Sequence, residues 1–157
     1  MAATEMLARL EQLATEIGAL HSKLILLVGA PHTGKTALLS AFAKRVEAIP
    51  LNVGSELGRR LAAIPQKQRH LEAGTALREL ADLHANGDLL LMDNIELLFD
   101  TSLQLNPLDL LKRHAHSRRV VAVWPGELRS GRLAYAEMGH SEYQDYAADG
   151  LVALTMQ

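Results

Sequence analysis

The feature that most constrains the fold is an eight-residue motif between an apolar segment and an amphipathic one. Residues 29–36 read Gly-Ala-Pro-His-Thr-Gly-Lys-Thr and match the pattern G-x-x-x-x-G-K-[ST]. Before it, Lys23 is followed by a continuous apolar run at residues 24–28, as in a strand covered on both faces. Apolar residues after it, through about residue 47, keep helical spacing. A strand, this motif and a helix in succession predict a phosphate-binding loop.

The residue types of the loop explain how it would hold a nucleoside triphosphate. Glycines allow a tight turn whose N–H groups surround an anion, and the following helix directs its positive dipole end at the same phosphates. Lys35 is expected to reach the β- and γ-phosphates, and the Thr36 hydroxyl to bind Mg²⁺. The nucleotide, expected to be ATP, would therefore contact the whole loop: Gly29, Ala30, Pro31, His32, Thr33, Gly34, Lys35 and Thr36.

A second apolar segment, residues 89–92, ends at Asp93. It is typical of the strand whose terminal carboxylate binds Mg²⁺ opposite Thr36. Many related ATPases place a Glu directly after that Asp to activate water, whereas this chain has Asn94. Asn94 would hold water only by hydrogen bonds, and Glu96 either orients the water or faces solvent. We therefore expect a catalytic set of Lys35, Asp93, Asn94 and Glu96, metal ligation by Thr36 and Asp93, and slow hydrolysis.

Apolar segments separated by helical stretches recur as far as the fourth strand and predict right-handed crossovers in a parallel sheet. We expect one domain over residues 1–157 with a three-layer α/β P-loop NTPase fold of the ASCE or AAA-like type. It should have a mostly parallel five-stranded sheet, an N-terminal amphipathic helix (1–21) packed on or beside the core, and no C-terminal helical lid. Strands are expected at 23–28, 51–53, 89–92, 120–124 and 151–154, and further helical stretches at 56–64, 73–84 and 108–116.

Beyond the fourth strand the chain is polar, with several glycines and tyrosines. We interpret residues 140–146 as a solvated loop, with a docking surface as the alternative. Trp124 ends the fourth strand, where related ATPases often carry a polar sensor. Its indole offers one donor, so packing at the sheet edge is the preferred interpretation over base stacking.

Arginines near the fourth strand are the first candidates for a finger that reaches a neighbour's nucleotide. Solvated charges or ion pairs are the alternative for each of them. The candidates are Arg118, Arg119, Arg129 and Arg132.

Composition excludes several classes of protein. No cysteine is present, so disulfides, thiolate nucleophiles and Cys-ligated zinc are excluded, as fits a cytoplasmic protein. A formal net charge of -2 gives no overall electrostatic attraction to nucleic acid or to an anionic membrane surface. No segment approaches the roughly 20 apolar residues of a membrane span.

The sequence resembles the BrxF family, the small P-loop proteins of type 3 bacteriophage exclusion (BREX) defence systems. Its narrowest signals are the Asp-Asn-Ile-Glu-Leu-Leu-Phe run at 93–99 and the Trp-Pro-Gly turn at 124–126. The likeness extends over segments 24–36, 51–53, 56–57, 59–61, 91–99, 120–126 and 132–135. It implies an ATP-binding accessory component that acts with the larger BREX subunits and touches DNA, if at all, only indirectly.

Three functions are left open by the sequence. The first is an ATPase or ATP switch whose nucleotide state controls assembly with itself or with partners. The second is a small-molecule kinase, and the third is a nucleotide-binding module that hydrolyses little or nothing. A GTPase is disfavoured because no Asn-Lys-x-Asp motif follows the fourth strand.

Overall fold

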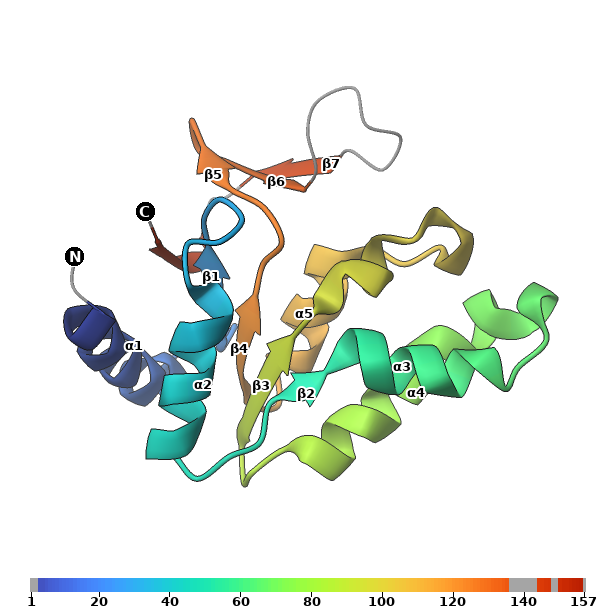
Figure 1. The fold of residues 1–157 in the computed structure, drawn as a ribbon, viewed down its shortest axis with the longest axis horizontal. Helices are drawn as coiled ribbons and strands as arrows, with labels where there is room; N and C mark the ends of the chain where they lie inside the picture. The colour runs from blue at the N-terminus through green and yellow to red at the C-terminus, as the bar shows by residue number, and fades with distance from the viewer. Residues whose placement is uncertain (1–2, 136–143, 148–149, 157) are drawn as a thin grey trace.

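The fold is built on a five-stranded parallel sheet with the strand order β2-β3-β4-β1-β8 (Figure 1). The computed structural model describes residues 3–135, 144–147 and 150–156. The prediction of a mostly parallel five-stranded α/β fold is confirmed. The strands are β1 (Leu24–Val28), β2 (Leu51–Asn52), β3 (Leu89–Asp93), β4 (Arg119–Val123) and β8 (Val152–Thr155).

Helices cover both faces of this sheet, with α1 and α2 on one side and α3, α4 and α5 on the other (Figure 1). All five residues of β1 are buried, because alternate side chains enter the two cores. Each such side chain contributes about 1.5–3 kcal/mol of burial energy. The helices are α1 (Ala3–Glu16), α2 (Lys35–Arg45), α3 (Val53–Ala62), α4 (Arg69–His84) and α5 (Pro107–His114), with short 3₁₀ turns η1 (Ile17–Ala19), η2 (Gln66–Gln68), η3 (Ile95–Phe99) and η4 (Thr101–Leu103).

The N-terminal helix α1 lies against α2 and contributes to the core on that face. Met6, Leu10 and Ala14 are its buried residues and follow the 3–4 spacing of one helix face. No helix in the described ranges is both long and apolar enough to cross a membrane.

The second strand is shorter than the sequence suggests. The sequence predicts Val53 as its last residue, but Val53 begins α3. The reason is a helix cap: the Asn52 side-chain oxygen accepts a hydrogen bond from the Ser55 N–H at 3.0 Å. The helix α4 also begins at Arg69, four residues before the predicted start at residue 73.

A second, antiparallel sheet replaces part of the expected solvated tail. It contains β5 (Leu128–Arg129), β6 (Arg132–Tyr135) and β7 (Gln144–Ala147). Its first two strands are joined by Ser130 and Gly131, both with positive φ (50° and 74°), as in a tight hairpin. Residues 140–143 of the segment interpreted as a solvated loop lie outside the described ranges. No helix follows α5 in the described part of the chain.

Aromatic side chains join this small sheet to the main core. Tyr135 stacks on Phe99 with ring centroids 3.8 Å apart. Trp124 lies edge-on to both Phe99 and Tyr146, and its indole N–H donates to the Ala134 carbonyl at 2.9 Å. Because Trp124 is fully buried, base stacking by this residue is excluded and its aromatic packing role is established.

Candidate functional site

The phosphate loop leaves the carboxyl end of β1 and enters α2, at the top of the main sheet in Figure 1. Gly34 caps α2 with φ 91°, a left-handed conformation that glycine adopts without strain. Gly29 has φ 150°, and a Cβ there would lie 2.6 Å from the Met156 carbonyl oxygen. The chain therefore requires glycine at both fixed positions of the motif.

The Lys35 ammonium folds back over the loop. Its Nζ donates to the carbonyl oxygens of Gly29 at 2.7 Å and Trp124 at 2.8 Å. Burial lowers the pKa of Lys35 from its usual value, against the opposing pull of nearby carboxylates, in which Glu96 leads Glu127 and Asp93. The ammonium is thus held at the loop by carbonyl groups that a phosphate would replace.

Thr36 and Asp93 meet at the ends of α2 and β3. The Thr36 hydroxyl donates to Asp93 Oδ1 at 3.2 Å. A hydroxyl and a carboxylate in contact are the hard oxygen donors that Mg²⁺ prefers. Thr36 and Asp93 are 57 positions apart in the sequence. Together they fit a magnesium ion, which would neutralise charge on the β- and γ-phosphates.

Asn94 has a structural role, in hydrogen bonds to the β2–α3 junction, that the sequence does not indicate. It adopts a left-handed conformation with φ 54°, and its Nδ2 donates to Asn52 Oδ1 at 2.9 Å. Its carbonyl accepts from Gly54 N at 2.9 Å. A Cβ on Gly54 would lie 2.5 Å from Asn94 Nδ2, so glycine makes room for this amide. The Asn94 side chain therefore ties the end of β3 to the start of α3.

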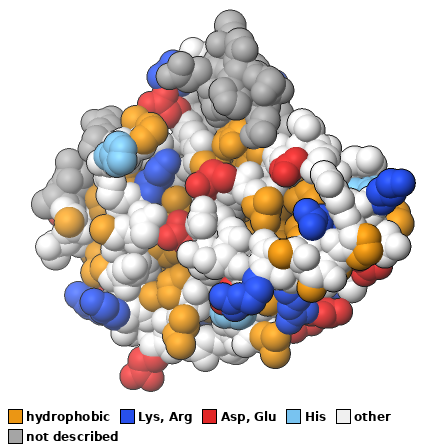
Figure 2. Space-filling model, turned by 45° about the vertical axis from the view of Figure 1, so that its right-hand side comes forward, with side chains coloured by type: hydrophobic (Ala, Val, Ile, Leu, Met, Phe, Trp, Pro, Cys, Tyr) orange, Lys and Arg blue, Asp and Glu red, His pale blue; other side chains and the backbone are white. Residues whose placement is uncertain are grey.

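Glu96 is exposed on η3, two residues beyond Asn94. It lines an open groove of about 630 Å³ between α3, η3 and β6, together with Asp100 and Tyr135. On the face shown in Figure 2, acidic side chains are spread around the middle of the molecule. Of the carboxylates near the loop, Glu96 acts most strongly on Lys35. Its role in orienting water stays a prediction.

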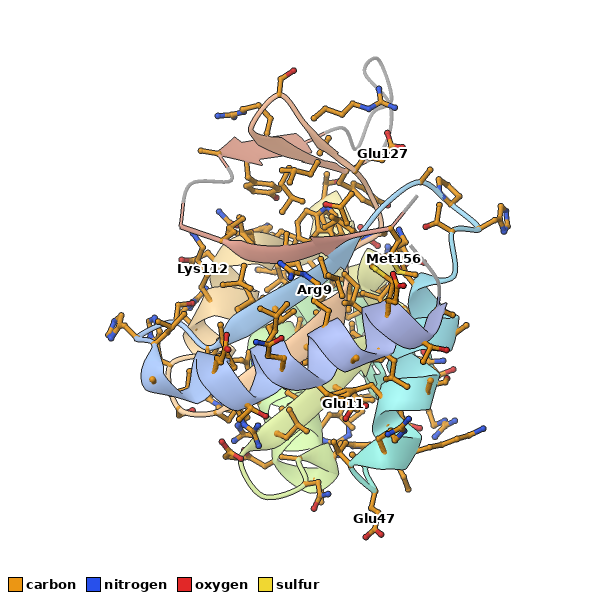
Figure 3. All side chains as sticks on the ribbon, turned by 90° about the vertical axis from the view of Figure 1, so that its left-hand side faces the viewer. Arg9, Glu11, Glu47, Lys112, Glu127 and Met156 are labelled. Atoms are coloured by element: carbon orange, nitrogen blue, oxygen red, sulfur yellow. The ribbon has the colours of Figure 1, made fainter. Side chains whose placement is uncertain are left out.

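The structure brings one further carboxylate, Glu127, into this region. The turn before it is fixed because Gly126 O accepts from Gly29 N at 3.0 Å, and a Cβ on Gly126 would lie 1.9 Å from the Ala134 carbonyl oxygen. Figure 3 shows Glu127 and Met156 beside the end of β1, where the loop begins. Glu127 pairs with Arg129 on β5. The position of Glu127, a charged residue just after the fourth strand, is the signal in the sequence by which it could have been identified.

The candidate arginines divide into two groups by position. Arg118 and Arg119 lie at the start of β4, the opposite end of the sheet from the loop. They form ion pairs with Asp82 at 2.6 Å and Asp88 at 2.8 Å, respectively. The other two, Arg129 and Arg132, lie on the small sheet near the loop. Only the second group remains close to the nucleotide site of its own chain.

Comparison with solved structures finds likenesses in fold at low sequence identity. The chain resembles a DNA replication initiation factor with a TM-score of 0.52 and 18% identity, over 96% of this chain and 44% of that one. It aligns with C. elegans PCH-2 at a TM-score of 0.46 and 17% identity, over 98% of this chain and 42% of that one. This chain therefore spans less than half the length of either structure.

Sequence comparisons add no family assignment. No protein-family model matches the chain, and no curated protein sequence matches it. The strand order, the loop between β1 and α2, and the likeness in fold to the initiation factor together define a three-layer P-loop NTPase fold.

Proposed function

We propose that the protein binds Mg²⁺-ATP in loop 29–36 and hydrolyses it slowly. The observation that carries this proposal is that Lys35, Thr36 and Asp93 come together at the carboxyl ends of the parallel strands β1 and β3. Lys35 supplies a cation for the β- and γ-phosphates. Thr36 and Asp93 supply the oxygen ligands for the metal. These are the groups that Mg²⁺-nucleotide binding needs.

Slow hydrolysis follows from the environment of Asn94. An amide accepts no proton from water at neutral pH, so it cannot act as a general base. Its Nδ2 is also engaged by Asn52. Glu96 is the remaining carboxylate on the same segment, and it is exposed. Turnover is therefore expected to depend on an imperfectly placed base or on a partner that completes the site.

For the cellular role, we propose an accessory component of a bacterial phage-defence complex in the cytoplasm. The resemblance to the BrxF family supports this assignment. Nucleotide state would control assembly of the protein with itself or with other BREX subunits. An open groove beside Asn94 and Glu96 supports a site that a neighbouring subunit completes.

Phosphate release and particle size test the proposal together. Wild-type protein with ATP and Mg²⁺ should release phosphate without any acceptor, and its mass by light scattering should rise with a non-hydrolysable ATP analogue. Lys35→Ala should lose both responses, whereas Lys44→Ala, an exposed lysine on the same helix, should keep them. Failure of the wild-type protein to bind ATP would refute the proposal. Binding of ATP without release of phosphate would show that the protein is a nucleotide-binding module that does not hydrolyse ATP.

The kinase alternative is supported by the groove lined by Glu96, Asp100 and Tyr135. Its polar groups adjoin the end of β3 that carries Asp93, where an acceptor molecule would meet the γ-phosphate. A kinase would release little phosphate until an acceptor is added. The acceptor-free assay therefore separates the two functions.

A further inference from the structure

Strand β8 forms one edge of the main sheet and, in the described part of the chain, pairs only with β1 (Figure 1). The Met156 N–H donates to the Val28 carbonyl at 2.8 Å, so the backbone groups of alternate residues of the strand face β1. The N–H and C=O groups of Ala153 and Thr155 therefore face away from the sheet. No hydrogen bond within the described ranges engages these outward groups. The edge thus presents donors and acceptors to a further strand.

Among the described edge strands, β8 is the one without the usual protection against pairing. Proteins shorten exposed edge strands or place charged residues and proline on them. The opposite edge strand, β2, has two residues, and the edge strands of the small sheet carry Arg129 in β5 and Asp145 in β7. Strand β8 has four residues, and the run 151–156 reads Leu-Val-Ala-Leu-Thr-Met, with neither charge nor proline. Such an edge favours pairing with another chain.

The end of β8 also contacts the phosphate loop. The Met156 carbonyl oxygen lies 2.6 Å from the place that a Cβ on Gly29 would occupy. The Met156 Cε lies 3.7 Å from the corresponding position at Gly34. Figure 3, which faces this side of the molecule, shows Met156 beside the start of the loop. A nucleotide that orders the loop would therefore also order the strand that packs against its two fixed glycines.

We propose that the free edge of β8 pairs antiparallel with β8 of a second copy of this chain and joins the two five-stranded sheets into one. The inference rests on the proposed function, because it names the surface through which nucleotide state would control self-assembly. The strand is self-complementary: a two-fold axis at Ala153 places that residue opposite itself and pairs Leu151 with Thr155. Val152 then lies opposite Leu154, so the cross-strand pair is apolar and no like charges meet.

Sedimentation velocity with and without Mg²⁺ and a non-hydrolysable ATP analogue tests the proposal. Wild type with the analogue should form a dimer. Thr155→Pro removes the outward N–H of an exposed residue in each copy, so the dissociation constant of the dimer should rise at least about 10-fold. Thr155→Val is the matched control, because it keeps that N–H, and its dissociation constant should stay within about 2-fold of wild type. Thermal melts establish that both variants fold, and calorimetry measures binding of the analogue separately.

Single cysteines report the pairing directly, because the chain has none of its own. In Ala153→Cys the two Cα atoms would lie about 5.5 Å apart, within the range of roughly 4.4–6.8 Å for a disulfide. In Thr155→Cys, at a more exposed position, they would lie about 14 Å apart, at about 3.4 Å per residue. Mild oxidation should link Ala153→Cys into a covalent dimer and leave Thr155→Cys unlinked.

Wild type that binds the analogue but stays monomeric would overturn this inference and leave ATP binding intact. A dimer that Thr155→Pro does not weaken would overturn it too, as would equal cross-linking of the two cysteine variants. A dimer that Thr155→Pro disrupts, in a protein that binds no ATP, would support the β8 interface and refute the proposed function. The two failures are therefore distinguishable.

Discussion

Replacement of Asn94 by glutamate tests the explanation of slow hydrolysis. Asn94 directly follows Asp93, and its Nδ2 donates to Asn52 Oδ1 at 2.9 Å. Asn94→Glu would place a carboxylate where efficient ATPases of this fold carry their base. It would also break the amide contact and bring a second oxygen toward Asn52, whose own oxygen already caps α3 through Ser55. The change therefore alters both stability and chemistry.

The stability cost follows from two contributions. Loss of one hydrogen bond costs about 1 kcal/mol. Asn94 has φ 54°, and a residue less tolerant than asparagine of the left-handed region costs about 1–2 kcal/mol there. The variant should thus lose about 2–3 kcal/mol, or roughly 4–12 °C in melting temperature for a chain of this size. A domain with a typical stability of about 5–15 kcal/mol survives this loss.

The rate should change in the opposite direction. A positioned general base contributes about 10²–10⁴-fold, and strain at residue 94 will reduce that gain. We expect phosphate release at saturating ATP to rise at least about 10-fold. Asn94→Gln is the matched control, because it imposes the same strain without a base and should give no increase. A folded, ATP-binding Asn94→Glu protein with unchanged turnover would refute the explanation.

Three further predictions follow from the geometry of the site. Glu96→Gln should lower the rate of phosphate release about 100-fold, which is at the low end of the effect of a general base, and Glu127→Gln should lower it by less than about 3-fold. Equal losses in the two variants would contradict the assignment of Glu96 as the residue that orients water. Gly126→Ala should lower the free energy of unfolding in urea by at least about 2 kcal/mol, because its Cβ would meet the Ala134 carbonyl at 1.9 Å, whereas Gly74→Ala should raise it by about 0.5–1 kcal/mol. Thr36→Ala should abolish the gain in ATP affinity that Mg²⁺ gives and leave metal-free binding unchanged, as fluorescence titrations with and without EDTA would show; a retained Mg²⁺ effect would exclude Thr36 as a ligand.

The main sheet and its loop were predictable because their signals are local. The run from Leu24 to Lys35 contains a buried strand, a glycine turn and a helix start in direct succession. Asp93 ends a strand that is apolar throughout, so its place beside Thr36 follows from parallel pairing. Such patterns need no knowledge of distant contacts.

The environment of Asn94 was not predictable, because it depends on residues remote in sequence. Its partner Asn52 lies 42 positions away. The sequence shows that a Glu is missing after Asp93, but not that Asn94 in its place joins β3 to α3 through hydrogen bonds with Asn52 and Gly54. Likewise, Trp124 and Glu127 take their positions from a small sheet whose Ala134 carbonyl receives the indole N–H. The Ser130-Gly131 pair is a hairpin signal that, with flanking strand residues, indicates part of that sheet.

Calorimetric titration of ATP into the protein with Mg²⁺ tests the central claim most directly. Wild type should bind one ATP per chain, Lys35→Ala should show no heat of binding, and Lys44→Ala should match wild type. This result would establish the loop at residues 29–36 as the nucleotide site. Equal binding by wild type and Lys35→Ala would contradict the account, as would the absence of binding by wild type.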